Sequence, residues 1–191
     1  MGDDGARTNE EVDVMVPVQI LGVYLDPNSG SSIVLLGEPS DVTRVLPIFI
    51  GPAEAQAIAI GIAEVEMPRP GTHDLMVEII NRWHARLVEV DVTELRDGTF
   101  FAELELATAD GTQRVSSRPS DGIALAVRVG APIMVAQRVL DTAAVGVERG
   151  DDEPFDAAQI EAIVAEFQDF LATAEPEDFG APGGPPAEET P

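Results

Sequence analysis

The sequence predicts an α+β fold in which two units of strand, strand, strand and helix form one compact domain. Two observations carry this prediction. A strand-like segment, a turn, a proline, an acidic residue and an Ala-x-Ala helix face occur twice, with Pro52 and Pro119 67 positions apart. Strand-like segments separated by turn signals precede each of the two helices. The length of 191 residues and the 45% hydrophobic content are sufficient for one domain with a substantial core.

The two turns correspond to each other residue by residue. Glu54 matches Asp121, and each is expected in the first turn of its helix, where unpaired N–H groups and the helix dipole favour an acidic side chain. The alanines that follow also match. We interpret the repeat as an internal duplication whose halves pack around a pseudo-twofold axis.

The first unit is expected to contain three strands and a helix. Strand-forming residues are bounded by turn signals such as Asp-Pro-Asn-Ser-Gly at 26–30. Pro52 is well suited to the first turn of the helix, because a proline lacks an N–H that would be unpaired there. The predicted strands are 15–25, 32–37 and 45–50, and the predicted helix is 52–65.

The second unit follows a Pro-rich break at 66–71, which cannot continue a helix. Thr72 is expected to cap a helix over residues 73–83, and the apolar residues of that helix recur at helical spacing and are expected to face the core. These apolar residues are Leu75, Ile79, Ile80 and Trp83. The remaining predicted elements are strands at 86–95, 99–108 and 113–117, a helix at 120–129, a strand at 131–136 and a short helix or turn at 137–142.

The ends of the chain differ in composition from the central domain. Apolar residues of the C-terminal segment form one stripe at helical spacing, behind an Asp156–Gln159 pair that resembles a capping box. We expect this helix to pack on its own domain or on a second subunit. The predicted divisions are a flexible acidic arm at 1–13, the domain at 14–143, a linker at 144–155, the amphipathic helix at 156–172 and a disordered acidic Pro/Gly-rich tail at 173–191.

Charge and composition limit the possible functions. The net charge is −24, and all 11 basic residues are arginines. A broad basic face for nucleic acid is therefore excluded, and any contact with phosphates must be local or assisted by a metal. Because the chain has no cysteine, a metal must be held by oxygen or imidazole ligands. No signal peptide or membrane-spanning run is recognised, so a cytoplasmic location without a membrane partner is expected.

Several residues in the turns, and at the starts of the helices that follow them, could support chemistry on phosphates. His73 lies between Thr72 and Asp74 and could act as a general base or a metal ligand, although it could equally pack at a helix end. Arg69 and Arg118 could bind a phosphate, or pair with Asp74 and Asp121. The other histidine, His84, lacks such neighbours and is expected to be structural, and Arg128 is expected at a surface or interface.

Four motifs together resemble the bifunctional nuclease domain family over residues 14–143. They are Leu-Pro-Ile-Phe-Ile-Gly at 46–51 with Glu-Ala at 54–55, Arg-Pro-Gly-Thr-His-Asp-Leu at 69–75, Asp-Gly-Thr-Phe-Phe-Ala at 97–102, and Arg-Pro-Ser-Asp-Gly-Ile-Ala-Leu-Ala at 118–126. The resemblance implies a compact α+β domain and an activity on both DNA and RNA that some members have. One departure is Gly122, where the family pattern has alanine more often.

The first hypothesis is a phosphodiesterase acting on DNA or RNA with the help of Mg²⁺ or Mn²⁺. Glu54, Asp121 and His73 are the predicted metal ligands, and together with Asp74 they are the predicted catalytic residues. The predicted substrate-binding residues are Arg69, Arg118, Thr72 and Ser120.

Two alternatives remain open. The first is a non-catalytic assembly module whose C-terminal helix recruits a protein partner, and the second is a sensor of small anions. A homodimer is expected, because the Ala-rich helices and the C-terminal apolar stripe offer surfaces for association.

Overall fold

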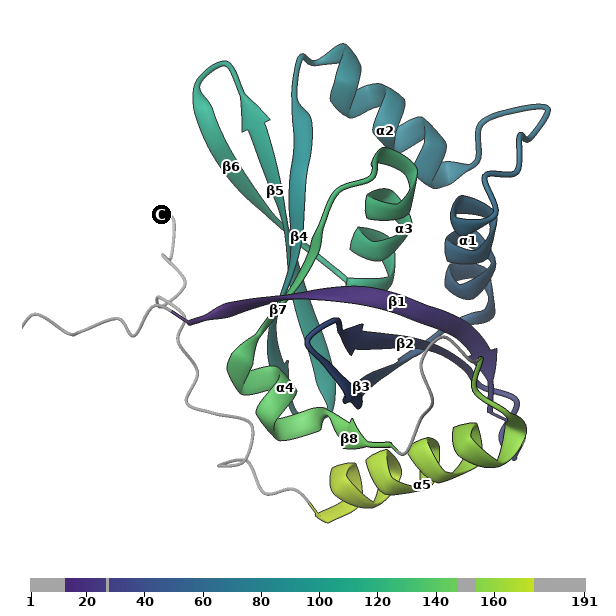
Figure 1. The fold of residues 1–191 in the computed structure, drawn as a ribbon. Helices are drawn as coiled ribbons and strands as arrows, with labels where there is room; N and C mark the ends of the chain where they lie inside the picture. The colour runs from purple at the N-terminus through teal and green to yellow at the C-terminus, as the bar shows by residue number, and fades with distance from the viewer. Residues whose placement is uncertain (1–12, 27, 148–153, 174–191) are drawn as a thin grey trace, which may run out of the picture.

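The computed structural model of the chain describes residues 13–26, 28–147 and 154–173. Apart from Asp13 and Thr173, the predicted acidic arm and the predicted C-terminal tail lie outside the described residues. The described part is an α+β domain, which confirms the predicted fold class (Figure 1).

The strands form one mixed sheet in the order β6-β5-β4-β7-β1-β2-β3-β8. All neighbouring strands are antiparallel except β4 and β7. The strand bounds are β1 Met15–Leu25, β2 Ser32–Glu38, β3 Asp41–Ile50, β4 Arg86–Arg96, β5 Thr99–Thr108, β6 Gly111–Ser117, β7 Ile133–Ala136 and β8 Val145–Gly146.

Strand β1 joins the two halves of the sheet. Its first residues, 15–18, pair with β7, and residues 19–25 pair with β2. The register shifts between Ile20 and Gly22, and Gly22 has a φ of 156°. Such a bulge increases the local twist, and in Figure 1 the strands β1 to β3 run across β4 and β5 rather than alongside them.

Five helices are described: α1 Pro52–Ile62, α2 Thr72–Arg82, α3 Pro119–Val129, α4 Gln137–Ala143 and α5 Ala157–Thr173. Helix α3 packs against both α1 and α2 and also against β4 and β5. Helices α1, α2 and α3 therefore form one group, while α4 and α5 lie at the other end of the molecule in Figure 1. The predicted element order is confirmed, whereas the internal duplication itself stays a prediction.

Gly122 allows α3 to approach the sheet closely. A Cβ atom added there would lie 2.5 Å from Cγ1 of Val90 on β4. The glycine weakens the helix only locally, because it lies in the first turn. The departure from alanine at this position therefore has a packing reason in this chain.

Helix α2 differs from the sequence prediction in two respects. Its N-cap is Gly71, and Thr72 is the first helical residue without a side-chain capping bond. Leu75, Ile79 and Trp83 were expected in the core but are exposed, Trp83 by 75%. Apolar residues occur on both sides of this helix, and Met76 and Val77 make the partial contact with the core.

The C-terminal helix α5 packs on its own domain. Phe167 is 1% exposed and stacks with Phe49 of β3 and Phe100 of β5, at ring-centroid distances of 5.9 Å and 6.0 Å. The Asp156–Gln159 capping box is confirmed by reciprocal hydrogen bonds of 2.8 Å and 3.0 Å. The sheet extends into the predicted linker, because β8 pairs with β3.

Candidate functional site at three helix N-termini

The first turns of α1, α2 and α3 lie around one hollow, and each carries an acidic residue at its third helical position. These residues are Glu54, Asp74 and Asp121. The hollow has a volume of about 340 Å³ and is lined by all three side chains. Helix N-termini present unpaired N–H groups, so anions and carboxylates are both favourable there.

Arg118 connects two of these acidic residues. Its Nη1 donates a hydrogen bond to Oε1 of Glu54 at 2.9 Å. Its Nε and Nη2 donate to Asp121 at 2.7 Å and 3.1 Å. Three of the five guanidinium N–H groups are thereby used, and the side chain is 64% exposed. Arg118 can therefore still bind a ligand from the solvent side.

Arg128 holds the third acidic residue and is almost completely buried. Its Nε donates to Asp74 Oδ1 at 2.5 Å, and its Nη1 donates to the carbonyl oxygens of Ala57 and Ala124 at 3.0 Å and 2.6 Å. The side chain is 10% exposed. The expectation that Arg128 is a surface or interface residue was wrong, because the guanidinium joins α1, α2 and α3 from inside.

His73 faces the same cluster from α2. Its Nε2 lies 3.1 Å from Oδ1 of Asp121, and its side chain is 11% exposed. Asp121 is thus shared between an arginine and an imidazole. An ionised carboxylate in this position fixes the ring orientation and favours the hydrogen on Nε2, which leaves the lone pair on Nδ1.

The surroundings favour the charged forms of Asp121 and Asp74. Burial raises the pKa of Asp121, but hydrogen bonds from Arg118 and His73 outweigh it, so the net pKa lies below the usual value. The hydrogen bond from Arg128 and the Gly71 N–H lower the pKa of Asp74. The hydrogen bonds and charges of Asp121, and then those of Glu54, raise the pKa of Arg118. Near neutral pH, Asp74, Asp121 and Arg118 are therefore charged, and each has a partner of opposite charge.

A second hollow adjoins the first and is largely apolar. It has a volume of about 260 Å³, and Phe49, Phe100 and Phe167 are among its lining residues. Glu54 and Arg118 line both hollows. Their ion pair therefore marks the boundary between a polar compartment and an apolar one.

The structure brings most of the predicted site residues together. Glu54, His73, Asp74, Asp121, Arg118 and Thr72 line the first hollow. Ser120 lines the second, and its neighbour in the motif, Pro119, is buried beside it. Arg69 lines neither hollow, and Asp74 pairs with Arg128 in its place. The catalytic and substrate-binding roles of all these residues stay predictions.

Arg128 is the residue that sequence reasoning missed. It lies between Val127 and Val129 on a helix that is otherwise rich in alanine and apolar residues. A lone arginine in such surroundings is a signal that its charge has a buried partner. The sequence gives no indication of which carboxylate on another helix that partner is.

The predicted metal set, Glu54, Asp121 and His73, does not fit a shared cation well in this arrangement. The Arg118 guanidinium already bridges the two carboxylates, and the imidazole donates to one of them. Within the described residues, the group of three acidic or imidazole side chains whose donor atoms all lie within 4.8 Å of one another is Glu89, Asp91 and Glu105. Metal binding at the helix N-termini stays a prediction.

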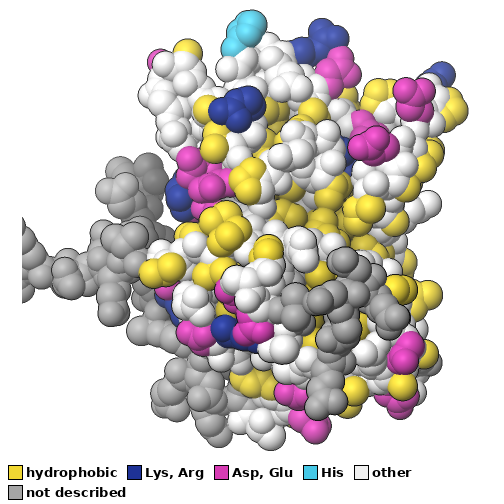
Figure 2. All heavy atoms as spheres, in the orientation of Figure 1, with side chains coloured by type: hydrophobic (Ala, Val, Ile, Leu, Met, Phe, Trp, Pro, Cys, Tyr) yellow, Lys and Arg dark blue, Asp and Glu magenta, His cyan; other side chains and the backbone are white. Residues whose placement is uncertain are grey.

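No broad basic face is visible on the side of the molecule drawn in Figure 2, where the described arginine side chains appear as separate groups. None of the described helices combines the length and the apolar character needed to cross a membrane.

Comparison with known proteins gives two findings. The profile of the family described as "Bifunctional nuclease domain" matches residues 34–148. Two curated proteins, Rv1829 and MT1877 from two strains of Mycobacterium tuberculosis, are 40% identical to this chain over 167 residues. The matched region covers 87% of this chain and 99% of each relative, and both relatives are described as uncharacterized proteins.

Proposed function

The chain belongs to the bifunctional nuclease domain family, and from this membership we propose that it hydrolyses phosphodiester bonds of DNA or RNA at the cluster around Asp121. The observation that supports this proposal most strongly is the shared carboxylate. Asp121 accepts hydrogen bonds from both His73 and Arg118 at the edge of an open hollow. A potential base and a potential phosphate ligand are thereby held side by side.

His73 is the general base in this proposal. With Nε2–H donated to Asp121, Nδ1 takes a proton from the attacking water, whose oxygen forms a new bond to phosphorus. The phosphorus–oxygen ester bond breaks, and the leaving oxygen takes its proton from solvent. Asp121 stabilises the imidazolium ion that forms, as a buried carboxylate does in other catalytic His–Asp pairs.

Arg118 binds the phosphate that is attacked. Two of its N–H groups are not used by Glu54 or Asp121, and they can donate to two phosphate oxygens. The surrounding helix N-termini add favourable dipoles for the negative charge that develops during the reaction. Glu54 is a positioning residue in this scheme, because it holds the guanidinium from the side of α1.

The apolar hollow suits a nucleobase next to the bound phosphate. Phe49 and Phe100 are half-buried and line it, and aromatic side chains bind bases of single strands by stacking with little sequence preference. The Glu54–Arg118 pair at the boundary would then lie between base and phosphate. This arrangement favours a single-stranded or unpaired substrate.

The acidic charge of the chain opposes binding of a polyanion. With a net charge of −24, long-range repulsion has to be overcome by the local arginine and helix N-termini. We therefore expect weak binding with few phosphate contacts. No step of the proposed reaction uses a metal ion at the helix N-termini, where the guanidinium of Arg118 serves as the cation.

A nuclease assay on the homogeneous full chain tests the proposal. We expect His73→Ala and Asp121→Asn to lower the cleavage rate of single-stranded DNA and RNA by about 10²–10⁴-fold, the usual contribution of a general base. The matched control is His84→Asn, which changes an exposed histidine with a φ of 55° that asparagine tolerates.

Each variant is assayed with and without a chelator at equal folded concentration, together with Glu54→Gln. Cleavage that is equal in the wild type, His73→Ala and Asp121→Asn would point to a contaminant or another site and would refute the proposal.

One further observation favours assembly as a second candidate function. Leu75 and Ile79 of α2 and the C-cap residue Trp83 lie four positions apart and are all exposed. Of the surfaces expected to form a dimer, the alanines of α3 and the apolar stripe of α5 pack in the core, whereas Ala53 and Ala59 of α1 are exposed. If the chain self-associates through this surface of α2, the Trp83→Ser variant should have a lower sedimentation coefficient than the wild type. Its nuclease activity per folded chain should be unchanged.

A further inference from the structure

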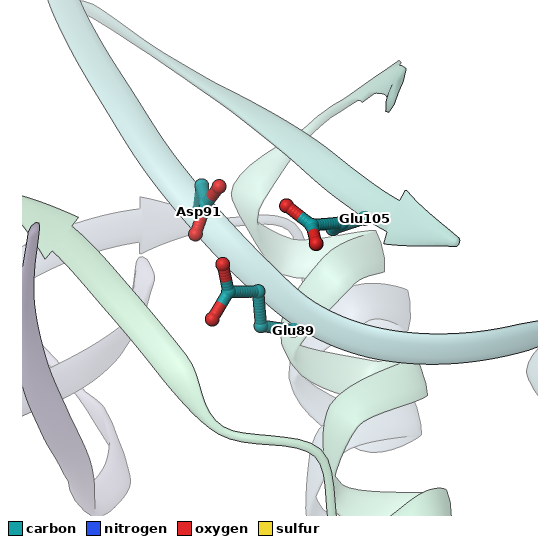
Figure 3. Close-up of side chains that lie close together, drawn as sticks. All are labelled: Glu89, Asp91 and Glu105. Carbon is teal, nitrogen blue, oxygen red and sulfur yellow. The ribbon is translucent and has the colours of Figure 1, made fainter. Parts of the chain in front are cut away.

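Three carboxylates on the sheet converge away from the site described above. Glu89 and Asp91 are two positions apart on β4, and Glu89 pairs across the strands with Glu105 on β5. Side chains with this spacing share one face of a sheet. One donor oxygen from each residue lies within 4.8 Å of the other two, and Figure 3 shows the three carboxylates pointing toward one another.

Asp91 is the unusual member of the group. Its side chain is 1% exposed, and neither of its carboxylate oxygens has a hydrogen bond. Arg114 approaches Oδ2 at 3.3 Å without hydrogen-bond geometry, because it donates instead to Glu103 and Glu105, each at 3.1 Å. Within the described residues, the ion pair with Arg114 is thus not accompanied by a hydrogen bond to either oxygen of Asp91. Buried carboxylates without a hydrogen bond are rare because their desolvation is costly.

The local charges do not balance. Glu89, Asp91, Glu103 and Glu105 surround a single arginine, Arg114. Burial, followed by the charge of Glu89, raises the pKa of Asp91 to about 6. The region thus lacks positive charge at neutral pH, and the deficit is concentrated where the three donor oxygens meet.

We propose that Glu89, Asp91 and Glu105 bind one hard divalent cation of the Mg²⁺, Mn²⁺ or Ca²⁺ class. Such ions take oxygen ligands at about 2.0–2.6 Å, so two ligands on opposite sides of one ion can be about 4–5 Å apart, which the separations here satisfy. The remaining coordination positions would be filled by water. Arg114 donates to Glu105 and forms an ion pair with Asp91, but it makes no hydrogen bond to either oxygen of Asp91.

The sheet separates this site from the cluster around Asp121. Val90 and Leu104 alternate with the three acidic residues, and both would contact a Cβ atom placed on Gly122 of α3. The acidic side chains consequently point to the face of the sheet opposite α3. The cation would stabilise the pairing of β4 with β5 and would take no part in the reaction proposed above, on which this inference does not depend.

Titration of the chelator-treated full chain with Mg²⁺, Mn²⁺ and Ca²⁺ separately tests the proposal by calorimetry and thermal unfolding. We expect at least one of these ions to bind with a stoichiometry of one per chain. The same ion should raise the Tm by about 5–10 °C at a hundred times its Kd. Glu89→Gln and Glu105→Gln, whose side chains are partly exposed, should each weaken binding by at least about tenfold.

Asp91→Asn should abolish binding while the metal-free variant unfolds at the same temperature as the metal-free wild type, or higher. Glu78→Gln, an exposed acidic residue paired with Arg82, and Glu54→Gln should both bind the ion as the wild type does. The proposal is overturned if no ion binds the wild type at millimolar concentration, if all three ligand variants retain wild-type affinity, or if Glu54→Gln alone loses binding. Because none of these readouts is catalytic, an inactive protein does not affect the outcome.

Discussion

We expect the substitution Arg128→Met to destabilise the chain by about 2–4 kcal/mol. Methionine retains the apolar stem but removes the guanidinium, so the Asp74 carboxylate and the carbonyl oxygens of Ala57 and Ala124 lose the three hydrogen bonds that it donates. A hydrogen bond from a charged donor contributes about 1.5–3 kcal/mol, but the two carbonyl oxygens keep their intrahelical bonds, so the three losses do not add in full. Asp74 is 35% exposed and can be rehydrated, so its share is smaller than for a fully buried charge.

Urea unfolding followed by circular dichroism measures this free energy of unfolding. The matching change in Tm is about 5–15 °C for a chain of this length. Arg69→Met is the control, because Arg69 is exposed and has no ion pair within the described part of the chain. It should change the free energy of unfolding by less than about 0.5 kcal/mol.

A double-mutant cycle with Asp74→Asn isolates the pair itself, and we expect a coupling energy of about 1–3 kcal/mol between Arg128 and Asp74. If Arg128→Met unfolded like Arg69→Met, the three-helix connection through this guanidinium would be incorrect. A coupling energy near zero would show that the carbonyl oxygens, and not Asp74, account for the loss.

Three other predictions concern stability. Because the hydrogen bond from Arg128 lowers the pKa of Asp74, the native state gains stability above the unfolded pKa of about 3.9 and loses it as the pH falls through the folded value. Asp74→Asn should therefore make the acid-induced decrease in Tm shallower. Gly122→Ala should destabilise by about 1–3 kcal/mol in urea unfolding, since the new methyl group would displace Val90. Phe167→Ala should cost about 3–5 kcal/mol by the same measurement, because it leaves a cavity between α5 and the sheet.

Exposed residues of the same kind serve as controls for these variants. Glu78→Gln should leave the acid-induced decrease in Tm as steep as it is in the wild type. Gly146→Ala should be nearly neutral, because a Cβ atom there would contact nothing within 4 Å. Phe101 lies under the guanidinium of Arg96, and Phe101→Ala should destabilise the chain less than Phe167→Ala does. If the Tm of Asp74→Asn decreased with acid as steeply as that of the wild type, the pairing described for Asp74 would be contradicted. A Gly122→Ala or Phe167→Ala variant as stable as the wild type would contradict the packing described for that residue.

The order of strands and helices could be predicted because β-branched runs, turn residues and prolines act locally. From their matching positions in two similar turns, the sequence predicted that Glu54 and Asp121 would lie near each other. In the structure, Arg118 joins them directly. The sequence predicted that Arg118 would either bind a phosphate or pair with Asp121. It did not predict that the guanidinium of Arg118 would bridge Glu54 and Asp121.

The orientation of α2 could not be predicted, because its apolar residues occupy both sides of the helix. Packing against α3 and β4 decides which side is covered, and Leu75 remains outside. The acidic group on β4 and β5 was also missed. Glu89 and Glu105 are far apart in the sequence, and only the strand register places them opposite each other.

Chemical rescue of His73→Ala by added imidazole is the most direct measurement of the proposed role of His73. We expect the cleavage rate of the folded variant to rise with the concentration of neutral imidazole, while the wild-type rate stays constant. A folded variant that cleaves like the wild type without imidazole, or that stays inactive at saturating imidazole, would contradict a base at this position.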